Sequence, residues 1–123
     1  MDMNETYEDY LKGIYLISKK NRGGWVSNSE ISEFLNVKPA SVSGMLHKLK
    51  KNGLITWKPR NSIRLTQKGK NIANKMIENY EKLREFFIGI LKLNDEKLID
   101  LLCCGIEHHI TPEVVEALDN LLP

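Results

Sequence analysis

Residues 27–53 of this chain read SNSEISEFLNVKPASVSGMLHKLKKNG and contain two helix signals separated by a short turn. Ser27 and Glu30 form a capping box, in which the hydroxyl and the carboxylate satisfy each other's backbone amides at a helix start. Pro39 suits the first turn of a second helix, because its fixed φ and missing N–H cost nothing there. The stretch therefore predicts two short helices, the second ending before Gly53, which can adopt the left-handed cap.

Signals on both sides of this pair of helices predict a winged helix-turn-helix. Upstream, apolar residues recur at helical spacing from Tyr7 to Lys19, after a candidate start at Thr6. Downstream, residues 54–57 and 63–66 are β-like runs on either side of a turn, which indicates a hairpin. Three helices followed by a hairpin make up the winged helix-turn-helix pattern.

The rest of the sequence predicts a helical region. We expect a long helix from about Gln67 to Leu91, another from Asn94 to about Ile110, and a short one after Thr111. These helices carry more apolar surface than they can cover themselves, so we expect a homodimer interface there. The predicted fold is mainly α with a small β-hairpin, an N-terminal winged helix-turn-helix followed by a helical dimerisation region.

The formal net charge of +2 hides an uneven distribution of charge. Residues 34–77 hold ten bases and no acid, residues 2–33 hold six acids and four bases, and residues 78–123 hold ten acids and four bases. A central basic block of this length is typical of a surface that binds a polyanion, most often nucleic acid. The alternative is an ordinary lysine-rich, solvated surface. The block predicts double-stranded DNA as partner.

The second helix of the pair and the hairpin supply the candidate DNA-binding residues. In a helix-turn-helix the second helix enters the major groove with its N-terminal residues at the base edges. Ser41 and Ser43 can donate to phosphate oxygens near the helix start, and Ala40 and Gly44 permit close approach. The alternatives are helix-start chemistry for the serines and a solvated side chain for His47. The full predicted set is Lys38, Pro39, Ala40, Ser41, Ser43, Gly44, His47, Lys48, Lys51, Lys58, Arg60 and Arg64.

Composition argues against several classes of protein. No apolar stretch reaches the roughly 18 residues of a membrane span, and the start MDMNETYEDY lacks the order of a signal peptide. We therefore expect a cytoplasmic protein without a membrane partner. The 123 residues contain no nucleophile elbow, phosphate loop or HExxH motif, so we expect neither an enzyme nor a small organic substrate. The adjacent Cys103 and Cys104 cannot build a disulfide framework, and we expect Cys103 to pack.

Residues 104–109 contain the densest set of possible metal ligands. Cys104, Glu107 and His108 stand at positions i, i+3 and i+4, which would place them on one helix face. A thiolate, a carboxylate and an imidazole together favour a transition metal such as iron, cobalt, nickel or zinc over magnesium or calcium. The spacing is equally compatible with a buried cysteine beside a surface glutamate and histidine.

Four motifs follow one another along nearly the whole chain: YEDYLKGIY at residues 7–15, VKPASVS at 37–43, RLTQKG at 64–69 and GIEHH at 105–109. Together they resemble the diphtheria toxin repressor and manganese transport regulator family, in its short form without the C-terminal barrel domain. The resemblance implies a metal-dependent transcriptional repressor that binds palindromic operators as a homodimer. It also implies a winged-helix domain over residues 1–66 and a helical metal-binding and dimerisation domain over residues 67–123.

The same resemblance implies a principal metal site at Asp9, Cys104, Glu107 and His108. We expect His109 to lie at the surface or behind the ligands. It implies Fe2+ or Mn2+ as the cofactor, with Zn2+, Co2+ or Ni2+ possible in vitro. The iron-responsive branch has cysteine at the position of Cys104, where the manganese branch has a carboxylate, so the residue favours iron.

Three positions depart from the ligand pattern of that family. Lys12 stands where the manganese branch has a second carboxylate, Tyr80 where both branches have histidine, and Arg84 where both have a carboxylate. We therefore expect the second, ancillary metal site to be absent or rebuilt. Lys12 could pair with Asp9 or Glu107 in the metal-free protein. The alternative function is a metal-independent winged-helix regulator with a degenerate sensing site.

Overall fold

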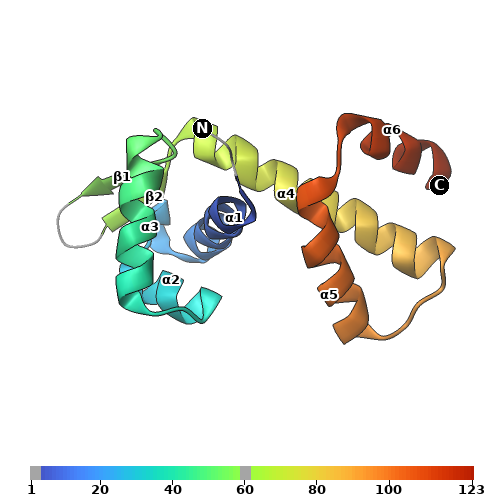
Figure 1. Ribbon diagram of the computed structural model, residues 1–123, viewed down its shortest axis with the longest axis horizontal. Helices are drawn as coiled ribbons and strands as arrows, with labels where there is room; N and C mark the ends of the chain where they lie inside the picture. The colour runs from blue at the N-terminus through green and yellow to red at the C-terminus, as the bar shows by residue number, and fades with distance from the viewer. Residues whose placement is uncertain (1–3, 59–61) are drawn as a thin grey trace. The chain divides into compact units, whose positions relative to one another are not determined.

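The computed structural model describes residues 4–58 and 62–123 and confirms the mainly α fold with one small β-hairpin (Figure 1). The chain divides into two compact units, the first ending at Asn74 and the second beginning at Lys75. The helices are α1 (Glu5–Lys20), α2 (Asn28–Leu35), α3 (Pro39–Lys51), α4 (Gln67–Glu85), α5 (Glu96–Ile106) and α6 (Pro112–Leu121), and the strands are β1 (Ile55–Lys58) and β2 (Ser62–Leu65). Within the described ranges, no helix has the length and apolar character needed to span a membrane.

Local capping signals explain where the first three helices begin. The predicted capping box is present, with the Glu30 amide donating to the Ser27 hydroxyl at 3.2 Å and the Ser27 amide donating to Glu30 Oε1 at 3.0 Å. The third helix has its proline in the first turn, as predicted. The predicted helix start at Thr6 is wrong, because the Asn4 side chain accepts the Tyr7 amide at 3.0 Å and caps α1 earlier.

The core of the first unit lies between α1, α2, α3 and the hairpin. Its fully buried side chains come from all of these parts and include Leu11, Ile14, Val26, Ile31, Val42, Leu46, Leu49, Leu54 and Ile63. Each such aliphatic side chain contributes about 1.5–3 kcal/mol through burial. Gly69, in the first turn of α4, lies so close to this core that an added Cβ would be 2.2 Å from the Leu54 carbonyl oxygen. The start of α4 is therefore held directly against the chain that enters β1.

The hairpin is antiparallel, with Ile55 opposite Leu65 and Trp57 opposite Ile63. Both strands lie one residue closer to the turn than predicted from residues 54–57 and 63–66. At the end of the second strand the reason is that Thr66 belongs to the start of α4. Thr66 accepts the Gly69 amide on its hydroxyl at 3.2 Å and so caps α4.

The second unit packs α5 and α6 against the C-terminal part of α4. Figure 1 shows the chain turning back after α4, and hydrogen bonds from α4 to both later helices confirm that they are neighbours. The buried core consists of Leu83, Ile99, Cys103 and Leu118, so Cys103 packs as predicted. Lys82 of α4 also forms an ion pair with Asp119 of α6.

The long predicted helix is not regular to Leu91. It changes after Glu85 into a π-helical turn, η3 (Phe86–Ile90), where the Leu91 amide donates to the Phe86 carbonyl at 3.1 Å. The turn ends at Ile90, and Lys92, two residues later, has a left-handed φ of 60°. Because a lysine and not a glycine adopts this conformation, the sequence contains no signal for the change.

The next helix is shorter than predicted at both ends. Asp95, and not Asn94, caps α5 by accepting two backbone amides. The helix ends at Ile106 and not at Ile110, and a 3-10 turn, η4 (Glu107–His109), follows it. The chain is extended at Thr111, because Pro112 restricts the residue before it to extended conformations.

Candidate functional site

α3 carries most of the predicted DNA-binding residues on the side opposite its buried face. Val42, Leu46 and Leu49 are fully buried against the core of the first unit. On α3 and at its N-cap, the exposed residues of the predicted set are Lys38, Pro39, Ala40, Ser41, Gly44, His47, Lys48 and Lys51. An added Cβ at Gly44 would meet nothing within 4 Å, so another molecule could approach the backbone of α3 closely at this point.

The two serines of α3 have different surroundings. Ser41 is exposed, whereas Ser43 is half-buried and accepts a hydrogen bond from the Asn28 side-chain amide at 2.9 Å. Asn28 is itself buried on α2, so this bond ties α3 to α2. Ser43 is therefore placed to hold the angle between the two helices, and Ser41 is placed to donate outward.

His47 and Trp57 connect α3 to the hairpin. Their ring centroids are 4.8 Å apart in an edge-on arrangement. His47 is exposed, and Trp57 is half-buried against the core. The sequence does not indicate this contact, because the two residues belong to different elements.

Two basic residues of the predicted set lie on the exposed face of the hairpin, Lys58 on β1 and Arg64 on β2. Arg60, also predicted, lies outside the described residues. The sequence analysis missed Trp25, whose ring lies within 6 Å of both hairpin cations. The available signal for a functional role of Trp25 was its position in the sequence, directly after a pair of glycines and two residues before the capping box of α2.

The predicted metal ligands come from both units. Asp9 is an exposed residue of α1, in the first unit. Cys104, Glu107 and His108 belong to the second unit, Cys104 on α5 and the other two on η4. α5 ends at Ile106 and runs directly into η4, and the Glu107 amide donates to the Cys103 carbonyl. That the three residues share one helix face stays a prediction.

Glu107 is the most buried of the predicted ligands, with only 1% of its surface exposed. Its backbone carbonyl accepts a hydrogen bond at 3.2 Å from the side chain of Asn79, a buried residue of α4. Charged carboxylates are rarely buried unless they are paired or bind a cation. Cys104 and His108 are half-buried, and His109 is exposed. A carboxylate, a thiol and an imidazole in consecutive turns are chemically suited to a transition metal.

The positions of the ancillary site are taken up by contacts between α4 and α5. The Tyr80 hydroxyl donates to Asp100 Oδ1 at 2.7 Å, and this bond, with burial, raises the pKa of Tyr80 to about 12. Cys104 Sγ also lies 3.7 Å from the same oxygen of Asp100. The sequence analysis missed Asp100, because one acid among ten in residues 78–123 carries no local signal.

Arg84 occupies the other altered position and pairs with Glu96 across the same helix pair. The shortest nitrogen-to-oxygen distance is 2.9 Å, and this bond raises the pKa of the Arg84 guanidinium further above its usual value. A cationic side chain thus stands where the resemblance implies a ligand.

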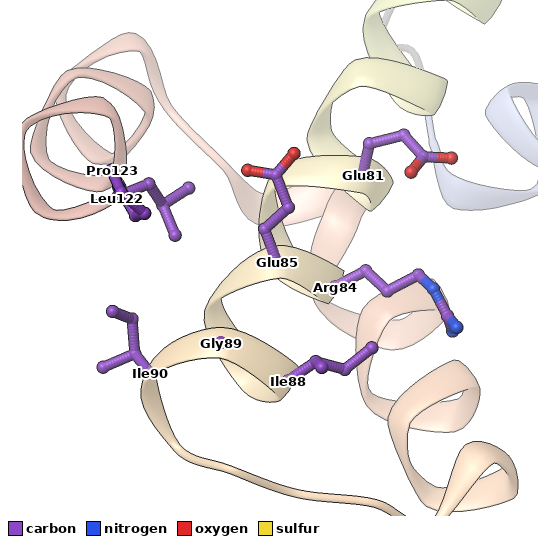
Figure 2. A pocket seen from close by; sticks show the side chains of 8 residues that line it. All are labelled: Glu81, Arg84, Glu85, Ile88, Gly89, Ile90, Leu122 and Pro123. Atoms are coloured by element: carbon purple, nitrogen blue, oxygen red, sulfur yellow. The ribbon is translucent and has the colours of Figure 1, made fainter.

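An open pocket of about 540 Å³ lies beside this region of the second unit, at the end of α4 and on η3 (Figure 2). Its lining residues are Glu81, Arg84, Glu85, Ile88, Gly89, Ile90, Leu122 and Pro123. None of the four predicted metal ligands lines it.

Comparisons with known proteins match the chain to two family models. Residues 2–63 match the family model described as iron dependent repressor, N-terminal DNA binding domain. Residues 66–123 match the model described as iron dependent repressor, metal binding and dimerisation domain.

Individual relatives match nearly the whole chain. It is 34% identical to an uncharacterized HTH-type transcriptional regulator of Methanocaldococcus jannaschii, over 94% of this chain and 91% of that protein. It is 36% identical to the HTH-type transcriptional regulator MntR of Oceanobacillus iheyensis, over 94% of this chain and 76% of that protein. Among solved structures, the manganese regulator SloR matches with a TM-score of 0.77 and 29% identity, over 98% of this chain and 54% of that chain. The chain thus spans about half the length of that solved relative.

Proposed function

The chain belongs to the iron-dependent repressor family, and from this membership we propose that it represses transcription by binding DNA as a metal-loaded homodimer. The family consists of metal-dependent transcriptional regulators and not of enzymes. The observation that carries the proposal is the exposed basic face of α3 and the hairpin, followed in the chain by a unit rich in metal ligands. The proposed domains are residues 1–66 and 67–123.

The proposed DNA contacts follow from the face that α3 leaves exposed. With Val42, Leu46 and Leu49 buried, the first turn of α3 can enter the major groove and the lysines near its end can reach phosphates. Two copies of this helix in a homodimer would read a palindromic operator with half-sites about 34 Å apart, or a multiple of that distance. No arginine, glutamine or asparagine lies on the exposed face of α3, so we expect part of the specificity to come from DNA shape.

The proposed metal ligands are Asp9, Cys104, Glu107 and His108. A bound divalent cation would supply positive charge that neutralises the carboxylates and holds ligands from both units together. The free energy of metal binding would then favour the arrangement in which the winged-helix domains of the two protomers match the operator. Cys104 favours Fe2+, whereas the similarity to a manganese regulator supports Mn2+. Zn2+, Co2+ and Ni2+ are the further ions expected to bind in vitro.

The proposed homodimer is supported by apolar side chains that the second unit leaves exposed. Leu98, Leu101, Val114 and Leu121 are between 40% and 70% exposed. Burying such side chains against a second copy would remove the unfavourable free energy of exposing apolar surface to water.

A metal-independent regulator remains the second candidate function. It is favoured by the contacts of Tyr80 and Arg84, which join α4 to α5 through protein side chains at the positions where relatives are expected to hold a second metal. In that case the protein would bind its operator equally well with and without metal.

The deciding experiment is a metal titration of the purified protein with DNA affinity as the readout. Fluorescence anisotropy of an operator duplex is measured with Fe2+ under anaerobic conditions, with Mn2+, with Zn2+ and with a chelator. Metal-stimulated binding supports the first function, and equal binding with chelator supports the second. About six to eight phosphate contacts per dimer would give a log–log salt slope near −0.9 per contact. No binding at low salt under any condition would refute both functions.

A further inference from the structure

The chain makes a tight turn immediately before Trp25. Gly23 and Gly24 both have a φ of 74°, a left-handed conformation that glycine adopts without steric cost. The Asn21 side-chain amide then donates to the Trp25 carbonyl at 2.9 Å and to Glu30 Oε2 at 2.8 Å. Trp25 is thereby anchored to the capping box of α2 through its backbone.

The next residue attaches this turn to the hairpin. The Val26 amide donates to the Ile63 carbonyl at 2.9 Å, and the Ile63 amide donates to the Val26 carbonyl at 2.8 Å. Both side chains are buried in the core. Because side chains alternate along an extended chain, Trp25 and Arg64, each adjacent to one of these residues, lie on the opposite, outer face.

Two cations of the hairpin lie over the Trp25 ring. Arg64 Cζ is 4.4 Å from the ring centroid and Lys58 Nζ is 5.2 Å from it, both within the distance at which an aromatic face attracts a cation. The Arg64 guanidinium also donates to the Gly23 carbonyl. A guanidinium has five N–H donors, so this bond leaves it able to contact a phosphate as well.

We propose that Trp25 is a positioning residue for DNA binding, which holds Arg64 and Lys58 together on the outer face of the hairpin for contact with the phosphate backbone. Without the ring, two like charges on flexible side chains would separate, and each would lose conformational freedom on binding a phosphate. The ring holds the two cations close together and restricts their side chains in the free protein. Less conformational freedom is therefore lost when DNA binds. The inference rests on the proposed DNA-binding function.

The test is a double-mutant analysis of DNA affinity in the full chain with metal, using an operator duplex selected by the wild-type protein. We expect Trp25→Ala to lower affinity about twofold to fivefold, which is the range of a surface cation–aromatic contact, and Trp25→Phe to restore part of it. We expect the salt slope to stay within one unit of wild type, because both cations remain. In an Arg64→Ala, Lys58→Ala background, Trp25→Ala should have no further effect.

Lys19→Ala is the matched control, since Lys19 lies 4.5 Å from the ring centroid of Tyr15 on the same helix and is not among the proposed DNA contacts. It should leave affinity unchanged, and circular dichroism melts should show that all variants are folded. An unchanged affinity for Trp25→Ala overturns the inference, as does an equal loss in the Arg64→Ala, Lys58→Ala background, which would mean that the ring contacts DNA itself. If wild type does not bind DNA at low salt, the proposed function fails and the inference fails with it.

Discussion

Replacement of Gly69 by alanine should destabilise the first unit, although alanine is the better helix former. The added Cβ would lie 2.2 Å from the Leu54 carbonyl oxygen, more than 1 Å inside ordinary contact, and that oxygen belongs to the backbone and cannot rotate away. Overpacking of this kind costs about 3 kcal/mol, and the helix propensity gained by Gly→Ala offsets about 1 kcal/mol. We expect a net loss of about 2 kcal/mol in the free energy of unfolding.

The matched control is Gly44→Ala in α3, where an added Cβ meets nothing within 4 Å. The same substitution should there raise the free energy of unfolding by about 0.5–1 kcal/mol. Urea denaturation followed by far-ultraviolet circular dichroism measures both effects, and a constant m value would show that the denatured state is unchanged. Equal or stabilising effects at the two glycines would refute the close approach of α4 to the chain before β1.

Three further predictions concern the metal ligands, the helix pair of the second unit and the capping box. Cys104→Ala or Asp9→Ala should reduce metal-stimulated DNA binding at least tenfold while leaving the circular dichroism melt largely unchanged, as anisotropy with and without Mn2+ would show. The raised pKa of Tyr80, about 12, implies that its contribution to stability is complete below pH 10 and is lost as the pH rises toward 12; Asp100→Asn should lower that pKa, measured by ultraviolet titration of the phenol. Ser27→Ala should cost about 1 kcal/mol of unfolding free energy, measured in urea, because α2 loses its cap.

Each of these outcomes has a contrary result. Unchanged metal stimulation in both ligand variants would remove Asp9 and Cys104 from the site. A Tyr80 phenol that titrates at its ordinary value in wild type would contradict the hydrogen bond to Asp100. A neutral Ser27→Ala would show that the box at the start of α2 contributes nothing to folding.

Much of the fold could be predicted because its signals are local. The capping box at Ser27, the proline that begins α3 and the left-handed Gly53 act within one helical turn, so a few neighbouring residues suffice to place them. The predicted helix ends are wrong where two neighbouring residues could both cap the helix, or where no residue marks the change. Asn4 caps α1 ahead of Thr6, and a left-handed lysine, Lys92, follows the π-helical turn after α4 where a glycine would have marked the change.

The candidate sites divide in the same way. The exposed face of α3 follows from the helical period. Apolar residues at every third or fourth position are buried, and the basic side chains between them are exposed. The change from α5 to the 3-10 turn at Glu107 does not follow from the ligand spacing, because that spacing is compatible with both kinds of helix. Tyr80 and Asp100 meet across twenty residues, and only the packing of α4 on α5 brings them together.

The sequence by itself determined the order of elements and the basic central block, because capping, periodicity and charge are properties of neighbouring residues. Its four motifs at residues 7–15, 37–43, 64–69 and 105–109 also carry the resemblance to the family of regulators. Only the tertiary structure decided which residues meet across elements: Trp25 with Arg64, Asn28 with Ser43, and Arg84 with Glu96. Such contacts depend on side-chain packing between segments distant in the chain, and no local pattern encodes them.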